Sequence, residues 1–179
     1  MYFNQKGCVN TEETVRLALA TAKERGIRHI AVASNTGGTA ILLAGHDLGV
    51  VCVTHVNGFA ECGKNEMPHD MRAKLQASGI QVLTTSHVLS GAERGISSRF
   101  GGAYPIEIMA HTLRMFGAGV KVAVEVSVMA LDAGLIPYGE PIIAVAGTKR
   151  GADTAVILTP AHAADILGTQ IHEIICKPA

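Results

Sequence analysis

A run of small polar residues from Ser34 to Ala40 has the composition of a loop that binds an anionic group. Hydroxyl and amide side chains flank two consecutive glycines in this run, which contains Ser34, Asn35, Thr36, Gly37, Gly38 and Thr39. An apolar strand at 29–33 precedes the run, and an apolar helix is expected to follow through 41–44. Backbone N–H groups can surround a phosphate there, and the helix N-terminus adds roughly half a positive charge. The alternative is an ordinary strand-to-helix turn that Ser34 or Thr39 caps.

A second glycine-containing loop, residues 147–151, offers cations to the same kind of ligand. Lys149 and Arg150 could approach a phosphate, which carries close to two negative charges, or they could be two solvated loop charges. Backbone and hydroxyl groups bind polyol oxygens well. The residues that could line a ribityl or sugar chain in this way are Gly147, Thr148, Asp153 and Thr154.

The long loop at 55–67 is rich in reactive side chains. His55 ends a strand, where a general acid or base is expected, although it could instead cap the strand end through its ring N–H. Phe59 could cover a planar ring or pin the loop to the body of the protein. Cys62 has only Lys64 nearby to activate its thiol, so we do not expect a nucleophilic cysteine.

Glu125 interrupts an apolar helix expected at 121–131. A buried carboxylate is costly unless it is paired, so a partner such as an arginine or backbone donors must satisfy Glu125, or it is an acid–base residue. His55 and Glu125 are therefore the catalytic candidates. Arg94 and Arg99 lie beyond the third strand, where an arginine could pair with a phosphate or form a surface ion pair.

Alternating apolar strands and helices must position these residues. The strands expected are 28–33, 50–54, 80–84, 141–146, 154–158 and 171–176. The helices expected are 11–26, 39–47, 68–77, 105–115 and 121–131, with shorter helical pieces at 91–102 and 160–167. Glu13 is expected to close a capping box on Asn10. This order predicts an α/β fold, a three-layer sandwich with a mostly parallel sheet. Loops 34–39, 55–67, 85–102 and 147–153 should then share the carboxyl edge of the sheet.

Composition narrows the class of protein further. The chain has 179 residues, 48% of them hydrophobic, and a formal net charge of zero, which predicts one domain over 1–179 and disfavours a nucleic-acid partner. No apolar run reaches the length of a membrane span, and no signal-peptide pattern opens the chain. The four cysteines and eight histidines lack metal-ligand spacing, so we expect no metal. Reduced thiols and a cytoplasmic location are expected.

The order of these motifs resembles the C-terminal α/β domain of pyruvate kinases. The resemblance rests on 36–40 (Thr-Gly-Gly-Thr-Ala), 142–147 and 152–155, and it is closer still to small stand-alone pyruvate kinase C-terminal-like proteins, the pyruvate kinase alpha/beta domain family. The segments that resemble these stand-alone proteins are 10–14, 89–91, 150–155 and 173–176. The chain has no room for the kinase's catalytic barrel of ~250 residues, so the resemblance does not imply kinase activity.

The resemblance implies a phosphorylated ligand bound by the 34–39 loop, with flavin mononucleotide (FMN) as the cofactor to test first. Arg99 could then contact the phosphate or the pyrimidine edge of the flavin. The reaction stays open. One alternative is a non-catalytic sensor of a sugar phosphate or another metabolite, and another is a non-redox sugar-phosphate enzyme that uses His55 or Glu125. Apolar residues and the resemblance to the kinase domain together predict a homo-oligomer.

Overall fold

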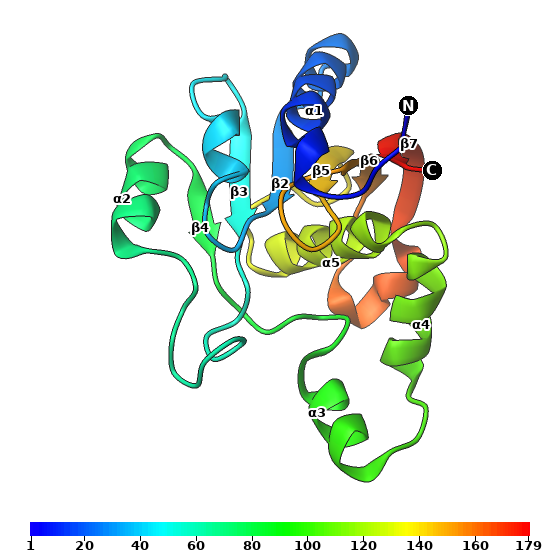
Figure 1. Cartoon of the computed structure of the whole chain (residues 1–179). Coiled ribbons are helices and arrows are strands. Elements are labelled where there is room, and N and C mark those ends of the chain that lie inside the picture. Colours follow the sequence, from blue (N-terminus) through cyan, green and yellow to red (C-terminus); the bar gives the residue numbers. More distant parts are fainter.

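A seven-stranded sheet forms the centre of the protein, which the computed structural model describes from Met1 to Ala179 (Figure 1). The strands are β1 (Tyr2–Phe3), β2 (His29–Ala33), β3 (Gly49–Val53), β4 (Gln81–Leu83), β5 (Ile142–Ala146), β6 (Thr154–Thr159) and β7 (Gln170–Pro178). Their order across the sheet is β1-β7-β6-β5-β2-β3-β4. Four neighbouring strands, β5, β2, β3 and β4, run parallel, and β6 is antiparallel to both of its neighbours. The sheet is therefore mostly parallel, as predicted.

Helices cover both faces of this sheet. The α-helices are α1 (Thr11–Arg25), α2 (His69–Ala77), α3 (Gly91–Phe100), α4 (Pro105–Arg114) and α5 (Ala118–Asp132). Three short 3-10 helices complete the fold: η1 (Cys8–Asn10), η2 (Ala40–Leu43) and η3 (Ala163–Gly168). Buried side chains of α1, η2 and α2 pack on one face, and those of α5 pack on the other. This arrangement confirms the predicted three-layer α/β sandwich.

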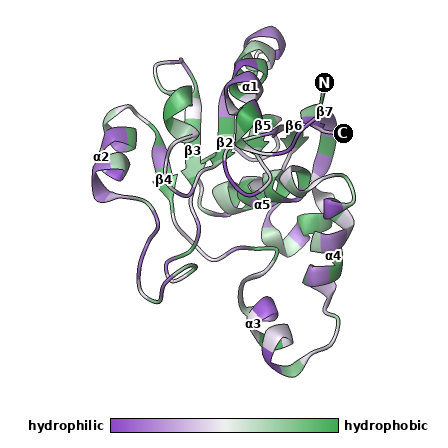
Figure 2. Cartoon of the chain, in the orientation of Figure 1, coloured by the Kyte–Doolittle hydropathy of each residue, from purple (hydrophilic) through white to green (hydrophobic).

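The core consists of aliphatic side chains on the central strands. Ile30 and Val32 of β2 face α1, whereas Ala31 between them faces α5, because successive strand residues point to opposite faces. Figure 2 shows apolar residues concentrated along the strands and α5. Helix α5 is buried along most of its length, and its charged residues, Lys121 and Glu125, are buried as well.

Two local expectations were wrong. The helix expected over 39–47 is only η2, because Ala44 is extended and Gly45 adopts a left-handed φ of 79°, which ends the helical hydrogen bonding. The capping box does not form either. Asn10 already has helical backbone angles and donates its side-chain amide to the Gln5 carbonyl at 2.7 Å, while Glu13 pairs with Arg16.

Helices α3 and α4 form an arm that extends away from the sheet (Figure 1). Helix α3 has no buried residue, and α4 joins the body through Ala110, which packs with Leu89 and two valines of α5. The helices of the protein lack the combination of length and apolar composition that crossing a bilayer requires. The arm matters for the site because each of its helices contributes one arginine to the cavity described below.

Candidate functional site at the carboxyl edge of the sheet

The loops that follow β2, β3, β4 and β5 meet at one edge of the sheet. These strands are parallel neighbours, so their carboxyl ends lie side by side. Loops that begin at Ser34, Thr54, Thr84 and Gly147 therefore all leave from this edge. The predicted clustering of the four loops is confirmed in the structure.

The loop at 34–39 leaves a row of backbone donors unused. The buried hydroxyl of Ser34 accepts hydrogen bonds from the N–H groups of Thr39 at 3.2 Å and Ala40 at 3.4 Å, so Ser34 caps η2. The N–H groups of residues 35–38 donate to no other protein atom. Gly37 adopts a φ of 85°, and a side chain there would also collide with Met71. The fold holds this loop open with four consecutive free amides.

A cavity of about 380 Å³ lies beside this loop, and we call it the edge cavity. Its walls come from the ends of β2 and β3, the loops after β3 and β4, the arm and α5. The lining residues are Ala33, Asn35, Val53, Thr54, His55, Phe59, His87, Ser90, Arg94, Arg114, Lys121, Val122, Glu125, Val126 and Met129. Asn35 connects the cavity to the free amides of the 34–39 loop. A second cavity of about 460 Å³ shares His87, Ser90 and Met129 with it.

The charged side chains of the edge cavity are three cations and one carboxylate. Arg94 of α3 and Arg114 of α4 have no carboxylate within ion-pairing distance. Lys121 pairs with Glu125, the remaining charged residue of the lining. The cavity therefore has an excess of positive charge, which favours an anionic ligand.

Glu125 is satisfied by two partners. One carboxylate oxygen accepts a hydrogen bond from the Lys121 ammonium at 2.5 Å, and the other accepts the Leu89 backbone N–H at 3.0 Å. The expected charged partner is thus a lysine of the same helix rather than an arginine. Burial lowers the pKa of Lys121, the Glu125 carboxylate opposes that shift, and the Arg114 and Arg94 cations lower the pKa further.

His55 belongs to a group of rings over the cavity. Its Nδ1 lies 2.6 Å from a Glu66 carboxylate oxygen, so the ring is held by the loop rather than capping the strand end. The Phe59 ring lies 3.7 Å from the His55 ring between centroids, and the His87 ring lies 5.4 Å away. A histidine oriented by a carboxylate can accept or donate a proton at its other ring nitrogen. The arrangement therefore suits an acid–base group.

The surroundings of His87 disfavour its protonated form. Burial lowers the pKa of His87, and the neighbouring His55 and Lys121 lower it further, while Glu125 and the Thr54 backbone favour the protonated ring. The net direction is downward. At neutral pH the imidazole is thus held in its uncharged form.

The side chains of Asp153 and Thr154, at the end of the loop at 147–153, are bonded within the protein. Asp153 is fully buried, and its carboxylate accepts hydrogen bonds from the N–H groups of Gly7 and Thr148 and from the Thr154 hydroxyl. Thr154 is fully buried beneath Gly119 of α5. The expected sugar-lining role of Asp153 and Thr154 is therefore not supported by their geometry, because protein groups already occupy them.

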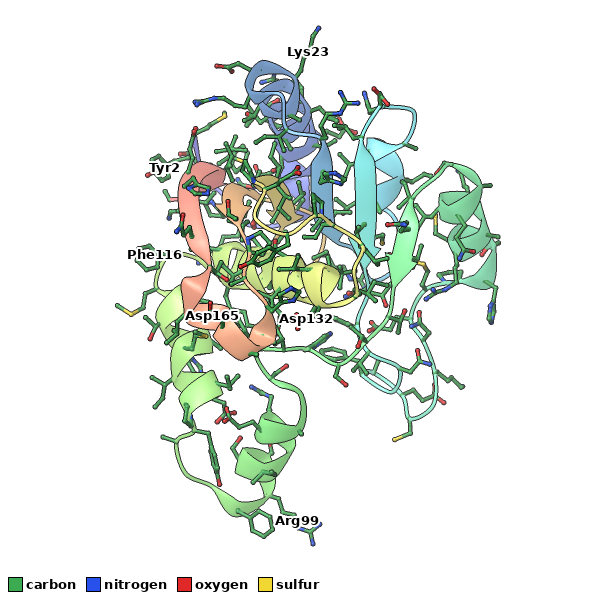
Figure 3. The ribbon with its side chains drawn as sticks, turned by 180° about the vertical axis from the view of Figure 1, so that it is seen from behind. Tyr2, Lys23, Arg99, Phe116, Asp132 and Asp165 are labelled. Carbon is green, nitrogen blue, oxygen red and sulfur yellow. The ribbon has the colours of Figure 1, made fainter.

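Other expected contacts are dispersed. Lys149 and Arg150 are exposed at the same edge of the sheet, as is Gly147 in part, but none of them lines the edge cavity. Arg99 lies at the far tip of α3, away from the sheet, as Figure 3 shows. Arg94, on an earlier turn of the same helix, lines the cavity instead.

The exposed Cys62 thiol makes no hydrogen bond, and burial raises the pKa of the Cys52 thiol to about 12.

Comparison with known proteins assigns the family. The model of the pyruvate kinase alpha/beta domain matches residues 12–158, most of the chain. The chain belongs to this family. Two solved structures similar to it are pyruvate kinases from Cryptosporidium parvum, one of them in complex with ADP. They are 16% and 17% identical, with TM-scores of 0.46 and 0.43 over 83% and 82% of this chain. This chain spans 22% of the length of each of those kinases.

Three residues of the site in this pyruvate kinase alpha/beta domain protein were not singled out from the sequence. Glu66 follows its partner His55 by 11 residues, across a loop whose shape no short-range pattern fixes. Arg114 reaches the edge only because α4 packs on α5. Lys121 carried a readable signal, since it precedes Glu125 by four residues and such pairs share one face of a helix.

Proposed function

We propose that this protein binds a phosphorylated small molecule with a planar ring, and that the edge cavity holds this ligand. The observation that carries the proposal is the pair of arginines, Arg94 and Arg114, which line the cavity without a carboxylate partner. Guanidinium groups bind phosphate oxygens through charge-assisted, often bidentate hydrogen bonds. A phosphate would be the anionic partner that these two arginines lack within the protein.

The free amides at 35–38 support the same ligand class. Asn35 begins this run and also lines the edge cavity, so neutral backbone donors and charged guanidinium groups approach one space from two sides. Consecutive backbone N–H groups are a common means of binding phosphate oxygens. Together they can neutralise a group that carries nearly two negative charges.

The rings of His55, Phe59 and His87 support a planar group on the ligand. They lie within 5.7 Å of one another between centroids, and all three line the cavity. The residues present therefore fit FMN, which combines a phosphate with a flat ring system, and FMN is the first ligand to test. A flavin, when bound, supplies hydride and electron transfer chemistry.

The test compares FMN with riboflavin, which has the same ring and lacks the phosphate. We expect Arg94→Gln or Arg114→Gln to weaken FMN binding at least about ten-fold, since a hydrogen bond to a charged group contributes roughly 1.5–3 kcal/mol. Riboflavin binding should change little. Calorimetry or quenching of flavin fluorescence measures both affinities, and mass spectrometry of ligand released from the purified protein identifies what it carries.

Arg99→Gln is the matched control, because Arg99 belongs to the same helix as Arg94 but lies at its far tip. It should leave FMN affinity unchanged. Equal affinity for FMN and riboflavin would contradict a phosphate site. A protein that ignores FMN but binds a sugar phosphate would overturn the flavin assignment and favour a metabolite sensor or a sugar-phosphate enzyme.

The cysteines support a cytoplasmic location for this activity. All four are free thiols: Cys8, Cys52, Cys62 and Cys176. Free thiols, two of them exposed, are typical of a reducing compartment. We therefore place the proposed binding activity in the cytoplasm.

A further inference from the structure

Lys121 combines burial with access to the edge cavity. It belongs to the first turns of α5, and its side chain is 6% exposed, yet it forms part of the cavity lining. Burying a lysine is costly, and replacing a buried ion pair with apolar residues is often neutral or stabilising. An ion pair at the wall of a cavity, rather than in the packed core, suggests a use for the amine.

The surroundings of Lys121 favour its uncharged form. Burial is the largest cause of its lowered pKa, and two further cations, Arg114 and Arg94, act in the same direction. Glu125, the only carboxylate in the lining, opposes them. Each unit by which a lysine pKa falls raises its neutral fraction at pH 7 about ten-fold. The neutral amine is the form that attacks carbonyl groups.

We propose that Lys121 forms an imine with the carbonyl group of an anionic small molecule held in the edge cavity. The proposal rests on the proposed function, because Arg94 and Arg114 would hold the anionic group of that molecule while its carbonyl carbon meets the lysine. The molecule that forms the imine is thereby a phosphorylated aldehyde or ketone, held through the same arginine contacts that we propose for the phosphate of FMN.

The step balances without an oxidant or a reductant. The ammonium of Lys121 first gives one proton to Glu125, its partner at 2.5 Å. The amine lone pair then forms a bond to the carbonyl carbon, and the carbonyl oxygen takes up protons from Glu125 and from the nitrogen. That oxygen leaves as water when the carbon–nitrogen double bond forms. The other oxygen of Glu125 keeps its hydrogen bond to the Leu89 N–H throughout.

Pyridoxal phosphate is a suitable probe because it carries an aldehyde, a planar ring and a phosphate. The protein is incubated with less than one equivalent of the probe, reduced with borohydride, digested and mapped by mass spectrometry. We expect the reduced adduct on Lys121 at a level at least about ten-fold above that on any exposed lysine, since the arginine contacts hold the phosphate of the probe at this site. Pyridoxal without the phosphate should label Lys121 at least about ten-fold less, by loss of the arginine contacts.

Two variants separate the imine from the structural role of the ion pair. Lys121→Arg keeps a cation beside Glu125 but cannot form the imine, so the adduct at 121 should vanish while the ion pair with Glu125 is retained. The double variant Lys121→Met, Glu125→Gln removes both charges and keeps an acceptor for the Leu89 N–H. Lys74→Arg on the exposed surface of α2 is the matched control and should not alter labelling of Lys121.

The outcomes distinguish this inference from the proposed function. Adducts spread over exposed lysines, with Lys121 spared and FMN binding still dependent on Arg94, would overturn the imine and leave the binding site standing. Equal labelling of Lys121 by pyridoxal and pyridoxal phosphate would support the nucleophile but overturn the phosphate anchor. Selective, phosphate-dependent labelling of Lys121 supports both.

Discussion

Two glycine-rich loops leave the same edge of the sheet, and they differ in how their side chains are bonded to the rest of the fold. In the loop at 34–39, the N–H groups of residues 35–38 have no protein acceptor, and the Ser34 hydroxyl is the one side-chain group that is hydrogen-bonded within the protein. In the loop at 147–153, the Asp153 carboxylate accepts three hydrogen bonds and is fully buried. We call the first the open loop, and the second, which the Asp153 side chain anchors to the fold, the closed loop. The N–H groups of residues 149–151 in the closed loop likewise donate to no protein atom.

The N-terminal segment causes this difference. Gly7 donates its N–H to Asp153, Thr11 accepts the N–H of Ala152, and Gly151 packs closely against Cys8. At the loop at 34–39, α2 packs against Gly37 through Met71, but a side chain added at Gly38 would meet no atom within 4 Å. Each loop contains two glycines, so glycine content alone does not reveal which donors are free.

The largest expected effect is on the stability of the closed loop. Asp153→Ala removes the acceptor of two backbone N–H groups and one hydroxyl in a buried site, so we expect the free energy of unfolding to fall by about 3 kcal/mol or more. Urea denaturation measures it. Asp153→Asn keeps one acceptor oxygen, so its free energy of unfolding should lie between those of Asp153→Ala and the wild type.

This comparison would fail if Asp153→Asn left stability unchanged and abolished FMN binding. That result would make Asp153 a ligand contact, and the loop at 147–153 would then resemble the open loop.

A smaller and different effect is expected in the open loop. Gly38→Asp places a carboxylate among the free amides, where it repels a phosphate, so FMN affinity should fall about ten-fold, or about 1.4 kcal/mol. Gly38 is exposed with open space around it, so stability should change by less than about 0.5 kcal/mol. Calorimetric titration and urea denaturation measure the two quantities.

Gly38→Asn is the matched control, because it has nearly the same size without the charge. It should bind FMN nearly as well as the wild type does. Equal losses for Gly38→Asp and Gly38→Asn would indicate a steric effect or an indirect one, and would argue against a phosphate beside these amides.

The smallest expected effect concerns His87 on the wall of the edge cavity. Its pKa in the folded protein lies below the ordinary value of 6.5, so the unfolded chain binds the proton first as the pH falls. The contribution of His87 to stability is therefore complete above about pH 6.5 and decreases as the pH falls toward the folded pKa. Urea denaturation at pH 7 and pH 5 measures this difference.

His87→Gln should make that pH dependence shallower, whereas His46→Gln, at an exposed site, should leave it unchanged. If His87→Gln left the pH dependence of the free energy of unfolding unchanged, the His87 ring of the wild type would titrate as it does in water. The cavity wall would then be open to solvent at this point.

Most of the framework could be predicted from local patterns. The apolar runs at 28–33, 50–54 and 141–146 correspond to β2, β3 and β5 within one residue at each end. Such runs indicate buried strands because both of their faces must avoid water. The prediction of a helix at 39–47 was wrong. Its apolar residues fit the single turn of η2 equally well, and the chain leaves the helical conformation at Ala44 and Gly45.

The candidate site was predicted only in part. His55 and Glu125 do line one cavity, and Asn35 joins them there. The partners that define their chemistry were not predicted, because the Glu66 contact depends on the path of a long loop and the Leu89 contact spans 36 residues. Arg99 was favoured over Arg94 without a means of knowing which turn of α3 faces the sheet.

The sequence by itself determined that this chain has buried, mostly parallel strands and that four loops share their carboxyl edge, since the alternation of apolar strands with helices can be read along the chain. Only the tertiary structure decided which loop is open. The hydrogen bond that closes the second loop joins Gly7 to Asp153, which are 146 residues apart. Whether a backbone donor is free depends on every segment that packs against it, and that information does not reside in the loop.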